Sequence, residues 1–345
     1  MENSIQQNNK IRYDWLDAIK ALAMALVIFG HLGLNGVGFY QVYASFIKLP
    51  LFFAASGFIF NPKRTDNVKE FLLSRVKRII VPYFCLSLII AFINFAVNGF
   101  SIDNWFKLYI YPVLYGTTMW FLPALFICNI AMLFAFKLSK NKDLLIIITA
   151  VISLICGYFA VSETHVFMSV NVALIAYPFC ILGYYLKKYI LSINKTMLKI
   201  IGIVCILAYI LIPIIYKIIT GNFNYINMYD NVYINYPVDM LASYTGVIGI
   251  FIVAQYIKIP KFVSWFGKNT LFYYAFHIPA CNFILWILQN LISENLTKDY
   301  LTSSYLNSII YSVITLVTLI LLFPICMLTN KYLPAVVGLK KQPRK

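Results

Sequence analysis

The first long apolar run of this chain reads WLDAIKALAMALVIFGHLGL and spans residues 15–34. Its length matches the ~20 residues that a helix needs to cross the ~30 Å hydrocarbon core of a bilayer. Lys20 and His31 lie inside the run, and Asp17 lies at its inner edge. A charge near the centre of a membrane helix costs roughly 2.5–3.5 kcal/mol on insertion scales, so such residues usually face a wet cavity or a protein interior. The run therefore predicts a membrane helix that carries part of a functional site.

The composition of the whole chain is typical of a polytopic membrane protein. Of the 345 residues, 61% are hydrophobic and only 12% are charged, whereas a soluble domain is nearer half apolar and about a quarter charged. The mean hydropathy is +0.80. Residues 1–13 are polar and the run after them is long enough to span, so we interpret that run as a retained helix and not as a cleavable signal.

Hydropathy predicts an all-α fold of about ten transmembrane helices, at roughly 20 residues each. We expect them at residues 15–34, 42–60, 79–97, 119–136, 144–161, 170–189, 198–216, 239–257, 270–290 and 308–330. Residues 104–118 are expected to form an interfacial or re-entrant piece. The sequence contains no internal repeat, low-complexity tract or long linker, so residues 1–345 are predicted to form a single membrane-embedded domain.

The cysteines indicate neither a metal site nor a disulfide framework. All seven fall within apolar runs, without Cys-x-x-Cys spacing: Cys85, Cys128, Cys156, Cys180, Cys205, Cys281 and Cys326. We interpret them as free thiols that pack as small apolar residues, and no metal is expected.

The formal net charge of +16 could suggest a nucleic-acid partner, but its distribution argues otherwise. Lys and Arg concentrate in alternate loops, and the intervening loops hold only Lys107, Lys217 and Lys298. This is the positive-inside bias, which predicts that both termini lie in the cytoplasm. The basic residues are therefore expected to meet membrane lipids, and no nucleic acid is expected.

This orientation gives the polar residues of the first helix their depths. Asp17 and Lys20 lie near its cytoplasmic end and His31 lies near its outer end. Asp17 and His31 are roughly 21 Å apart at 1.5 Å per residue, so Asp17 cannot be the carboxylate that orients His31. Asp17 and Lys20 form an i,i+3 pair, which either anchors the helix end or belongs to a binding site. His31 is either a functional group or a polar bridge between helices.

Two further polar residues lie within predicted spans. Lys48 is about two turns from the outer end of the second span, at a depth comparable with His31, and needs a partner or a wet cavity. Asp239, at the outer end of the eighth span, is a candidate partner for Lys48. His277, in the ninth span, either lines a pore or bridges helices by a hydrogen bond.

The outer loop of residues 217–239 is rich in tyrosine and asparagine. It holds Tyr225, Tyr229, Tyr233 and Tyr236 among Asn222, Asn224, Asn227, Asn231 and Asn235. Aromatic faces beside amide groups suit a sugar, which has apolar C–H faces and many hydroxyls. The alternative is an interfacial aromatic belt, which is general in membrane proteins.

Several segments of the chain together carry a resemblance to a known family. They are WLD (15–17) with Lys20 and VIFGH (27–31), LPLFF (49–53) with SGF (56–58), RVKR (75–78) with PY (82–83), WFL (120–122) with LF (125–126), and FGKNTL (266–271) with His277. In this order they are similar to the membrane acyltransferase-3 family, and closest to its fucose 4-O-acetylase-like branch. Many members carry His where this chain has Lys48.

The resemblance implies transfer of an acyl group, usually acetyl from cytoplasmic acetyl-CoA, to a hydroxyl on a bacterial surface glycan or its lipid-linked precursor. It implies that His31 is the catalytic residue and that the donor binds near Arg75 and Arg78. His suits removal of a hydroxyl proton, and an acyl-histidine intermediate is the alternative. Lys48 could stabilise the oxyanion that develops during transfer. With the donor site we group Lys20, Asp17 and His277.

Arg75 and Arg78 share a helix face if their segment is helical. Two guanidiniums there could clamp the phosphates of CoA, although topology and lipid phosphates also explain a juxtamembrane Arg. The sequence thus predicts a membrane-bound O-acetyltransferase in the bacterial plasma membrane. A transporter or flippase of glycan-linked lipids is the alternative, because intramembrane Lys and His also line substrate pathways. Against it, the chain lacks the inverted repeat of many transporters.

Overall fold

The computed structural model describes residues 12–32, 39–98, 104–140, 142–161, 166–291 and 304–339. These residues are almost entirely helical. The α-helices are α1 (Asp14–Leu32), α2 (Phe39–Ile47), α3 (Pro50–Phe58), α4 (Val68–Arg75), α5 (Val81–Asn98), α6 (Tyr111–Tyr115), α7 (Phe121–Leu138), α8 (Asp143–Phe159), α9 (Val170–Ile190), α10 (Lys195–Thr220), α11 (Tyr236–Val253), α12 (Lys261–Lys268), α13 (Thr270–Leu291) and α15 (Ser304–Tyr332). The strands are β1 (Ile226–Asn227) and β2 (Val232–Tyr233), which pair as an antiparallel hairpin.

Short helical turns connect several of these elements. They are η1 (Pro62–Thr65), η2 (Val76–Ile80), η4 (Phe106–Ile110), η5 (Phe167–Ser169), η6 (Ala254–Tyr256) and η7 (Pro334–Val337). Turns η2 and η4 are π-helical. Turn η4 and α6 lie in the segment of residues 104–118, which the sequence predicts to be interfacial or re-entrant, and both pack against α5.

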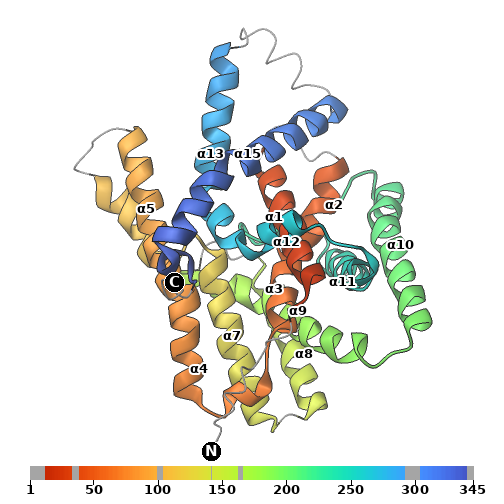
Figure 1. Ribbon diagram of the computed structural model, residues 1–345. Coiled ribbons are helices and arrows are strands. Elements are labelled where there is room, and N and C mark those ends of the chain that lie inside the picture. Colours follow the sequence, from red (N-terminus) through yellow and green to blue (C-terminus); the bar gives the residue numbers. More distant parts are fainter. Residues whose placement is uncertain are drawn as a thin grey trace, which may run out of the picture.

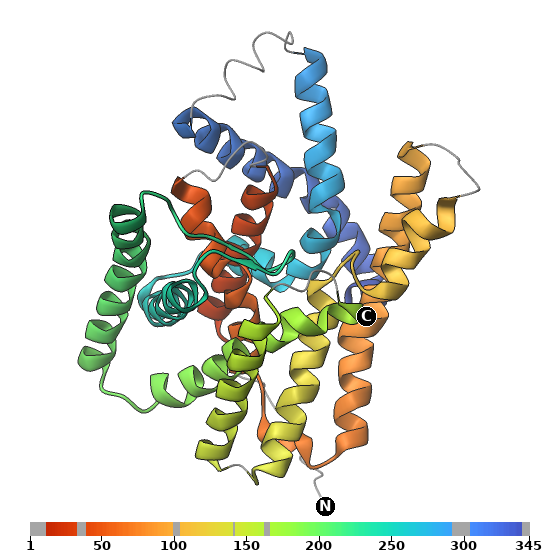
Figure 2. The ribbon, with the colours of Figure 1, turned by 180° about the vertical axis from the view of Figure 1, so that it is seen from behind.

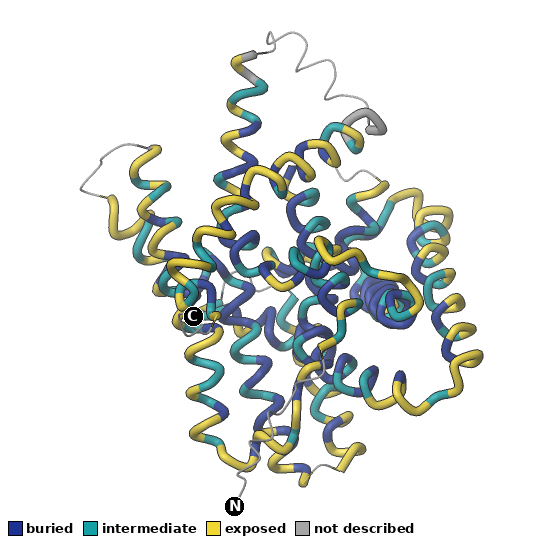
Figure 3. Tube along the Cα trace, in the orientation of Figure 1, coloured by how far each residue is buried: buried dark blue, intermediate teal, exposed yellow. Residues whose placement is uncertain are grey.

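The all-α, multi-pass prediction is confirmed. In the described part of the chain, 8 helices are long and apolar enough to cross a membrane, and α8 is an apolar helix of 17 residues. Together with the α2–α3 pair, they correspond one by one to the ten predicted spans. The periphery agrees with a lipid environment, because α10 exposes Ile203, Leu207 and Leu211 to the outside. Figure 3 shows α10 mostly exposed beside the buried α11.

The prediction of one continuous helix over residues 42–60 is wrong. Helix α2 ends at Ile47 and α3 begins at Pro50, so that Lys48 and Leu49 lie between the two. Pro50 has no N–H to donate and its ring disfavours a helix through the residues before it, which accounts for the break. A break at membrane depth is tolerated where it is buried in protein or lines a cavity, and Lys48 lines a cavity.

Small residues hold the central helices close together. Helix α3 packs along α9 and α1 packs against α12, around the middle of the bundle (Figure 1). A Cβ at Gly57 would lie 1.8 Å from the carbonyl oxygen of Cys180, and one at Gly183 would lie 1.9 Å from that of Ala54. A Cβ at Gly267 would lie 1.7 Å from the carbonyl oxygen of Asp17. Glycine at these positions lets backbones touch, as is usual between membrane helices.

Candidate functional site

One cavity of about 620 Å³ opens beside the last turn of α1. Its walls come from α1, α2 and the break that follows it, α5, the segment before α7, the loop between α10 and α11, and α13. We call it the histidine cavity. Its lining includes Gly30, His31, Lys48, Trp120, Tyr229 and His277. Three candidates that lie far apart in the sequence, His31, Lys48 and His277, therefore share one space.

The two histidines of this cavity come from different helices, and their rings lie close together. The ring centroids of His31, on α1, and His277, on α13, are 4.9 Å apart with the planes tilted by 55°. His31 is exposed in the cavity, whereas His277 is 1% exposed. Nδ1 of His277 lies 2.9 Å from the carbonyl oxygen of Tyr274, one turn earlier on α13. Its Nε2 is buried and has no hydrogen-bond partner among the described residues.

Lys48 lies directly over the backbone next to His31. A Cβ at Gly30 would lie 2.8 Å from Nζ of Lys48, so glycine at position 30 makes room for the ammonium. The expected pairing of Lys48 with Asp239 is wrong: Asp239 accepts hydrogen bonds from Nδ2 of Asn224 at 2.7 Å and from the backbone N–H of Asn235 at 3.0 Å. Among the described residues, Lys48 has no ion-pair partner. Its charge is therefore available inside the cavity.

The loop between α10 and α11 covers one side of the histidine cavity. Figure 2 shows it running from the periphery toward the middle of the molecule. Residues 225–230 line the cavity, and the backbone N–H of Ile226 donates to Oγ of Ser45 on α2 at 3.2 Å. Tyr233 and Tyr236 have a different position, because they are buried against each other with ring centroids 5.2 Å apart. The tyrosine-rich loop thus divides into a lining part and a supporting part.

The lining part of the loop faces an aromatic residue from another element. The rings of Trp120 and Tyr229 lie 5.9 Å apart between centroids. Burial and the neighbouring Asp230 raise the pKa of the Tyr229 phenol, which therefore stays neutral. Asn227 donates from Nδ2 to Oδ2 of Asp230 at 2.5 Å. Trp120 was absent from the predicted site, although it lies in one of the motifs that carry the family resemblance.

A second cavity, of about 240 Å³, lies toward the start of α1. Its lining includes Lys20, Ser56, Arg75, Arg78 and Asn129, and we call it the arginine cavity. Arg75 and Arg78 lie where α4 runs into the π-helical turn η2, so their segment is helical and both reach one space. Such π-turns are frequent at functional sites.

The guanidinium of Arg75 is not neutralised by any described residue. It lies over the ring of Phe71, with Cζ 4.8 Å from the ring centroid. Its Nε is buried and has no hydrogen-bond partner in the described part of the chain. A buried donor without a partner is unfavourable, and Arg presents a planar fork of donors that matches phosphate. The donor set of this cavity therefore fits an anion such as a phosphate.

Two residues that were grouped with the donor site do not line the arginine cavity: Asp17 lies beside its Lys20 wall, and His277 lines the histidine cavity instead. Asp17 is 3% exposed and accepts from Nζ of Lys20 at 2.6 Å and from Nε of Arg12 at 2.8 Å. The i,i+3 pair that the sequence predicts is therefore formed. Its effect is to hold the Lys20 ammonium at the cavity wall.

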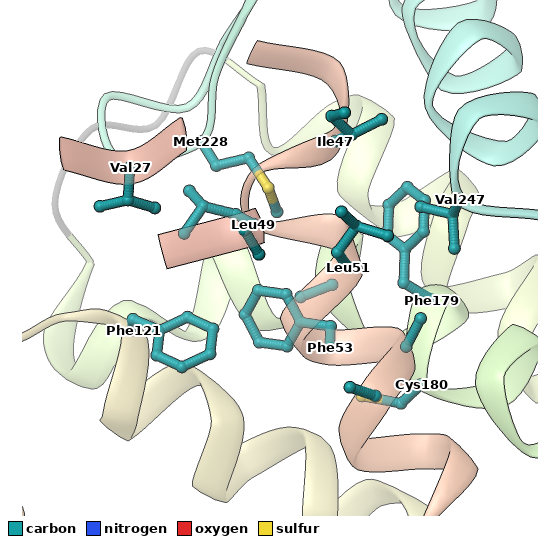
Figure 4. Packing of buried hydrophobic residues seen from close by; sticks show 14 of the residues in the cluster. Val27, Ile47, Leu49, Leu51, Phe53, Phe121, Phe179, Cys180, Met228 and Val247 are labelled. Carbon is teal, nitrogen blue, oxygen red and sulfur yellow. The ribbon is translucent and has the colours of Figure 1, made fainter. Parts of the chain in front are cut away.

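The two cavities meet at a single layer of side chains. Val27, Leu49 and Tyr274 line both of them. Figure 4 shows Val27 and Leu49 with Met228, which lines the histidine cavity, and Phe121, which lines the arginine cavity. A hydrogen bond holds Tyr274 in this layer: its hydroxyl accepts from the backbone N–H of Phe121 at 3.4 Å. Tyr274 was absent from the predicted site, and it lies one turn before His277 on α13.

Comparison with known protein families identifies the family of this chain. The model of the acyltransferase-3 family, described as an acyltransferase domain, matches residues 13–329, which include both cavities. No curated protein and no solved structure matches the chain.

Proposed function

Since the chain belongs to the acyltransferase-3 family, we propose that it is a membrane-bound O-acetyltransferase that uses acetyl-CoA. In this proposal the acceptor is a hydroxyl of a bacterial cell-surface polysaccharide or of its lipid-linked precursor. The observation that carries the proposal is the pair of cavities, one lined by His31 and His277 and one lined by Arg75 and Arg78, separated by one layer of side chains. A donor and an acceptor can approach this layer from opposite sides.

The arginine cavity suits the donor. Arg75, Arg78 and Lys20 line it, and three cations attract the phosphates of CoA. Its volume of about 240 Å³ is below the roughly 300–1,000 Å³ of a typical drug-sized ligand site. We therefore expect the phosphates and the thioester arm to occupy the cavity while the adenosine stays outside. The positive-inside bias of the loops supports a cytoplasmic position for this cavity.

The histidine cavity suits the acceptor and the chemistry. In the proposed reaction, His31 takes the proton of the acceptor hydroxyl while the hydroxyl oxygen bonds to the acyl carbon. The carbon–sulfur bond then breaks, and His31 returns the proton to the leaving thiolate, which gives CoA and the ester. The ammonium of Lys48, next to Gly30, stabilises the oxyanion that forms between these two steps.

The aromatic wall of the histidine cavity suits a sugar. Trp120 and Tyr229 offer flat faces to its C–H groups, while Asn227 and Asp230 offer polar atoms to its hydroxyls. The loop that carries three of these residues is fixed to α2 and α11 by hydrogen bonds. Because this wall is already ordered, less conformational entropy is lost when a ligand binds.

The test is transfer of labelled acetyl. The purified protein in nanodiscs is incubated with [¹⁴C]acetyl-CoA and membranes from the source organism in which the gene is deleted. We expect label in the polysaccharide or lipid-linked glycan fraction, in an ester that mild alkali releases. A preparation without the protein is the control. If the glycan lipid moves between leaflets and no label is incorporated, the chain is a transporter or flippase and the proposal is wrong.

Cysteine accessibility along α1 tests the two-cavity arrangement. On a background free of native cysteines, Lys20→Cys and His31→Cys are expected to react with polar thiol reagents, because each position lines a cavity. Acetyl-CoA should protect position 20 and leave position 31 reactive. A reagent that cannot cross the membrane should reach position 31 from outside only.

Leu22→Cys is the matched control for this labelling. Leu22 is 42% exposed on the outer surface of α1 and lines neither cavity, so lipid should shield a cysteine there from a polar reagent. Reaction at position 20 that acetyl-CoA does not slow would show that the donor binds elsewhere.

A further inference from the structure

His277 carries an acceptor that nothing in the described structure satisfies. The carbonyl oxygen of Tyr274 can only accept, so the 2.9 Å contact with Nδ1 of His277 requires that Nδ1 carries the proton. Neutral imidazole has one donor and one acceptor, so Nε2 then holds a lone pair. This lone pair is buried and has no partner among the described residues. A buried polar atom without a partner is costly, and natural proteins rarely keep one without a role.

The nearest ring to His277 across the cavity belongs to His31. The two centroids are 4.9 Å apart, a separation at which one nitrogen of each ring can come within the 2.7–3.2 Å of a typical N–H hydrogen bond. Catalytic hydrogen bonds are often long in the free enzyme and shorten in the substrate complex. The neighbours of His277 restrict its ring, because Tyr274 stacks on it at 6.0 Å with an interplanar angle of 24°.

We infer that His277 is the positioning residue of His31: its Nε2 accepts the N–H of His31 and so directs the other, unprotonated nitrogen of His31 at the acceptor hydroxyl. This inference rests on the proposed function. A general base must present its lone pair to the substrate, and the group on its other nitrogen decides which tautomer is present. Asp17 cannot act in this way, because it lies near the opposite end of α1 and pairs with Lys20 and Arg12.

A neutral partner also fits the charges that surround the pair. Among the described residues that line this cavity, Lys48 is the cation and Asp230 is the carboxylate. Asp230 interacts with Asn227 through Oδ2. Since His277 has a single acceptor atom and a fixed donor, it can orient His31 in only one way. A carboxylate beside Lys48 would instead attract the ammonium away from the reacting oxygen.

Nitrogen NMR measures the tautomer of His31 directly, without any substrate. The chain has 3 histidines, His31, His165 and His277, so a ¹⁵N-histidine sample of His165→Gln gives only four ring-nitrogen signals. At alkaline pH, we expect His31 to give two well-separated signals, which are typical of one tautomer. In His277→Leu these two signals should move toward each other as the tautomers exchange. Unchanged His31 signals in His277→Leu would overturn the inference.

The kinetic test uses two replacements of His277. His277→Gln keeps an acceptor oxygen near the position of Nε2, whereas His277→Leu removes the acceptor. We expect His277→Leu to lower kcat for acetyl transfer about 10- to 100-fold with little change in KM for acetyl-CoA, a smaller loss than removal of the base itself. His277→Gln should recover part of kcat. Equal kcat in the wild type and His277→Leu, or equal losses in Gln and Leu, would contradict a positioning role.

Cys281→Ala is the control for packing of α13. Cys281 is buried one turn beyond His277, contacts Thr318 of α15 at 3.5 Å and lines neither cavity. This variant should keep wild-type kcat and both His31 signals. The two readouts also separate the proposals: if His31 shows one tautomer that depends on His277 but no acetyl is ever transferred, the proposed function fails and the histidine pair stands.

Discussion

The variant His31→Ala is expected to lose acetyl transfer by at least about 10²- to 10⁴-fold, the usual contribution of a general base. At 1.36 kcal/mol per tenfold, this loss corresponds to about 3–5 kcal/mol of transition-state stabilisation. The protein should still fold and insert, because the imidazole is exposed in the cavity and an apolar side chain lowers the cost of insertion. The measurement is incorporation of labelled acetyl per purified protein, together with the acetyl content of the glycan in cells.

Two comparisons make this result specific. Leu22→Ala, on the exposed surface of the same helix, should keep both activity and expression. His31→Gln should be as inactive as His31→Ala, since an amide cannot take a proton near neutral pH. Normal acetyl content in cells that carry His31→Ala would remove His31 from the reaction.

Replacing Arg75 by Leu is expected to raise KM for acetyl-CoA about 10- to 100-fold, because a hydrogen bond to a charged group contributes about 1.5–3 kcal/mol. Arg75→Lys should recover little of this loss, since an ammonium cannot make the paired contacts of a guanidinium with phosphate. Arg78→Leu should have an effect in the same direction. Its size should be smaller, because Arg78 is exposed to solvent.

Lys77→Gln is the matched control for the arginines. Lys77 lies between them in the sequence, is exposed and does not line the arginine cavity. Initial rates as a function of acetyl-CoA concentration give KM for each variant. If Arg75→Leu and Lys77→Gln behave alike, the arginines act on topology or lipid contact and have no part in donor binding.

The positions of the helices could be predicted from the sequence because hydrophobic length is a local property. Each predicted span corresponds to a helix or, at α2–α3, to a broken pair. Even the break has a local cause in Pro50, whose effect on the preceding residues a hydropathy window averages away. The π-helical turn at residues 76–80 also has a local cause, since it ends two residues before Pro82, which lacks the N–H of a regular helix, just as the π-helical turn η4 ends two residues before Pro112.

The partners of the polar residues could not be predicted in the same way. A lysine in an apolar span predicts that a cavity or partner exists, but it does not say which helix supplies it. The pairing of Lys48 with Asp239 was predicted only from their similar depth in the membrane. The carboxylate of Asp239 instead accepts hydrogen bonds from Asn224 and Asn235, which are close to it in the sequence. These local hydrogen bonds stabilise the buried carboxylate of Asp239 without an ion pair to a distant lysine.

By itself, the sequence determined the all-α membrane fold and the residues whose polarity is out of place in lipid, since both follow from local composition, and it indicated the family through motifs that occur in a fixed order. Only the tertiary structure decided that His277 lies against His31, that Trp120 and Tyr229 form one wall, and that Val27, Leu49 and Tyr274 separate two cavities. The physical reason is that lipid is as apolar as the protein interior, so the hydrophobicity of a helix face does not indicate whether it contacts lipid or another helix. Contacts at small residues such as Gly57 and Gly183 make that choice.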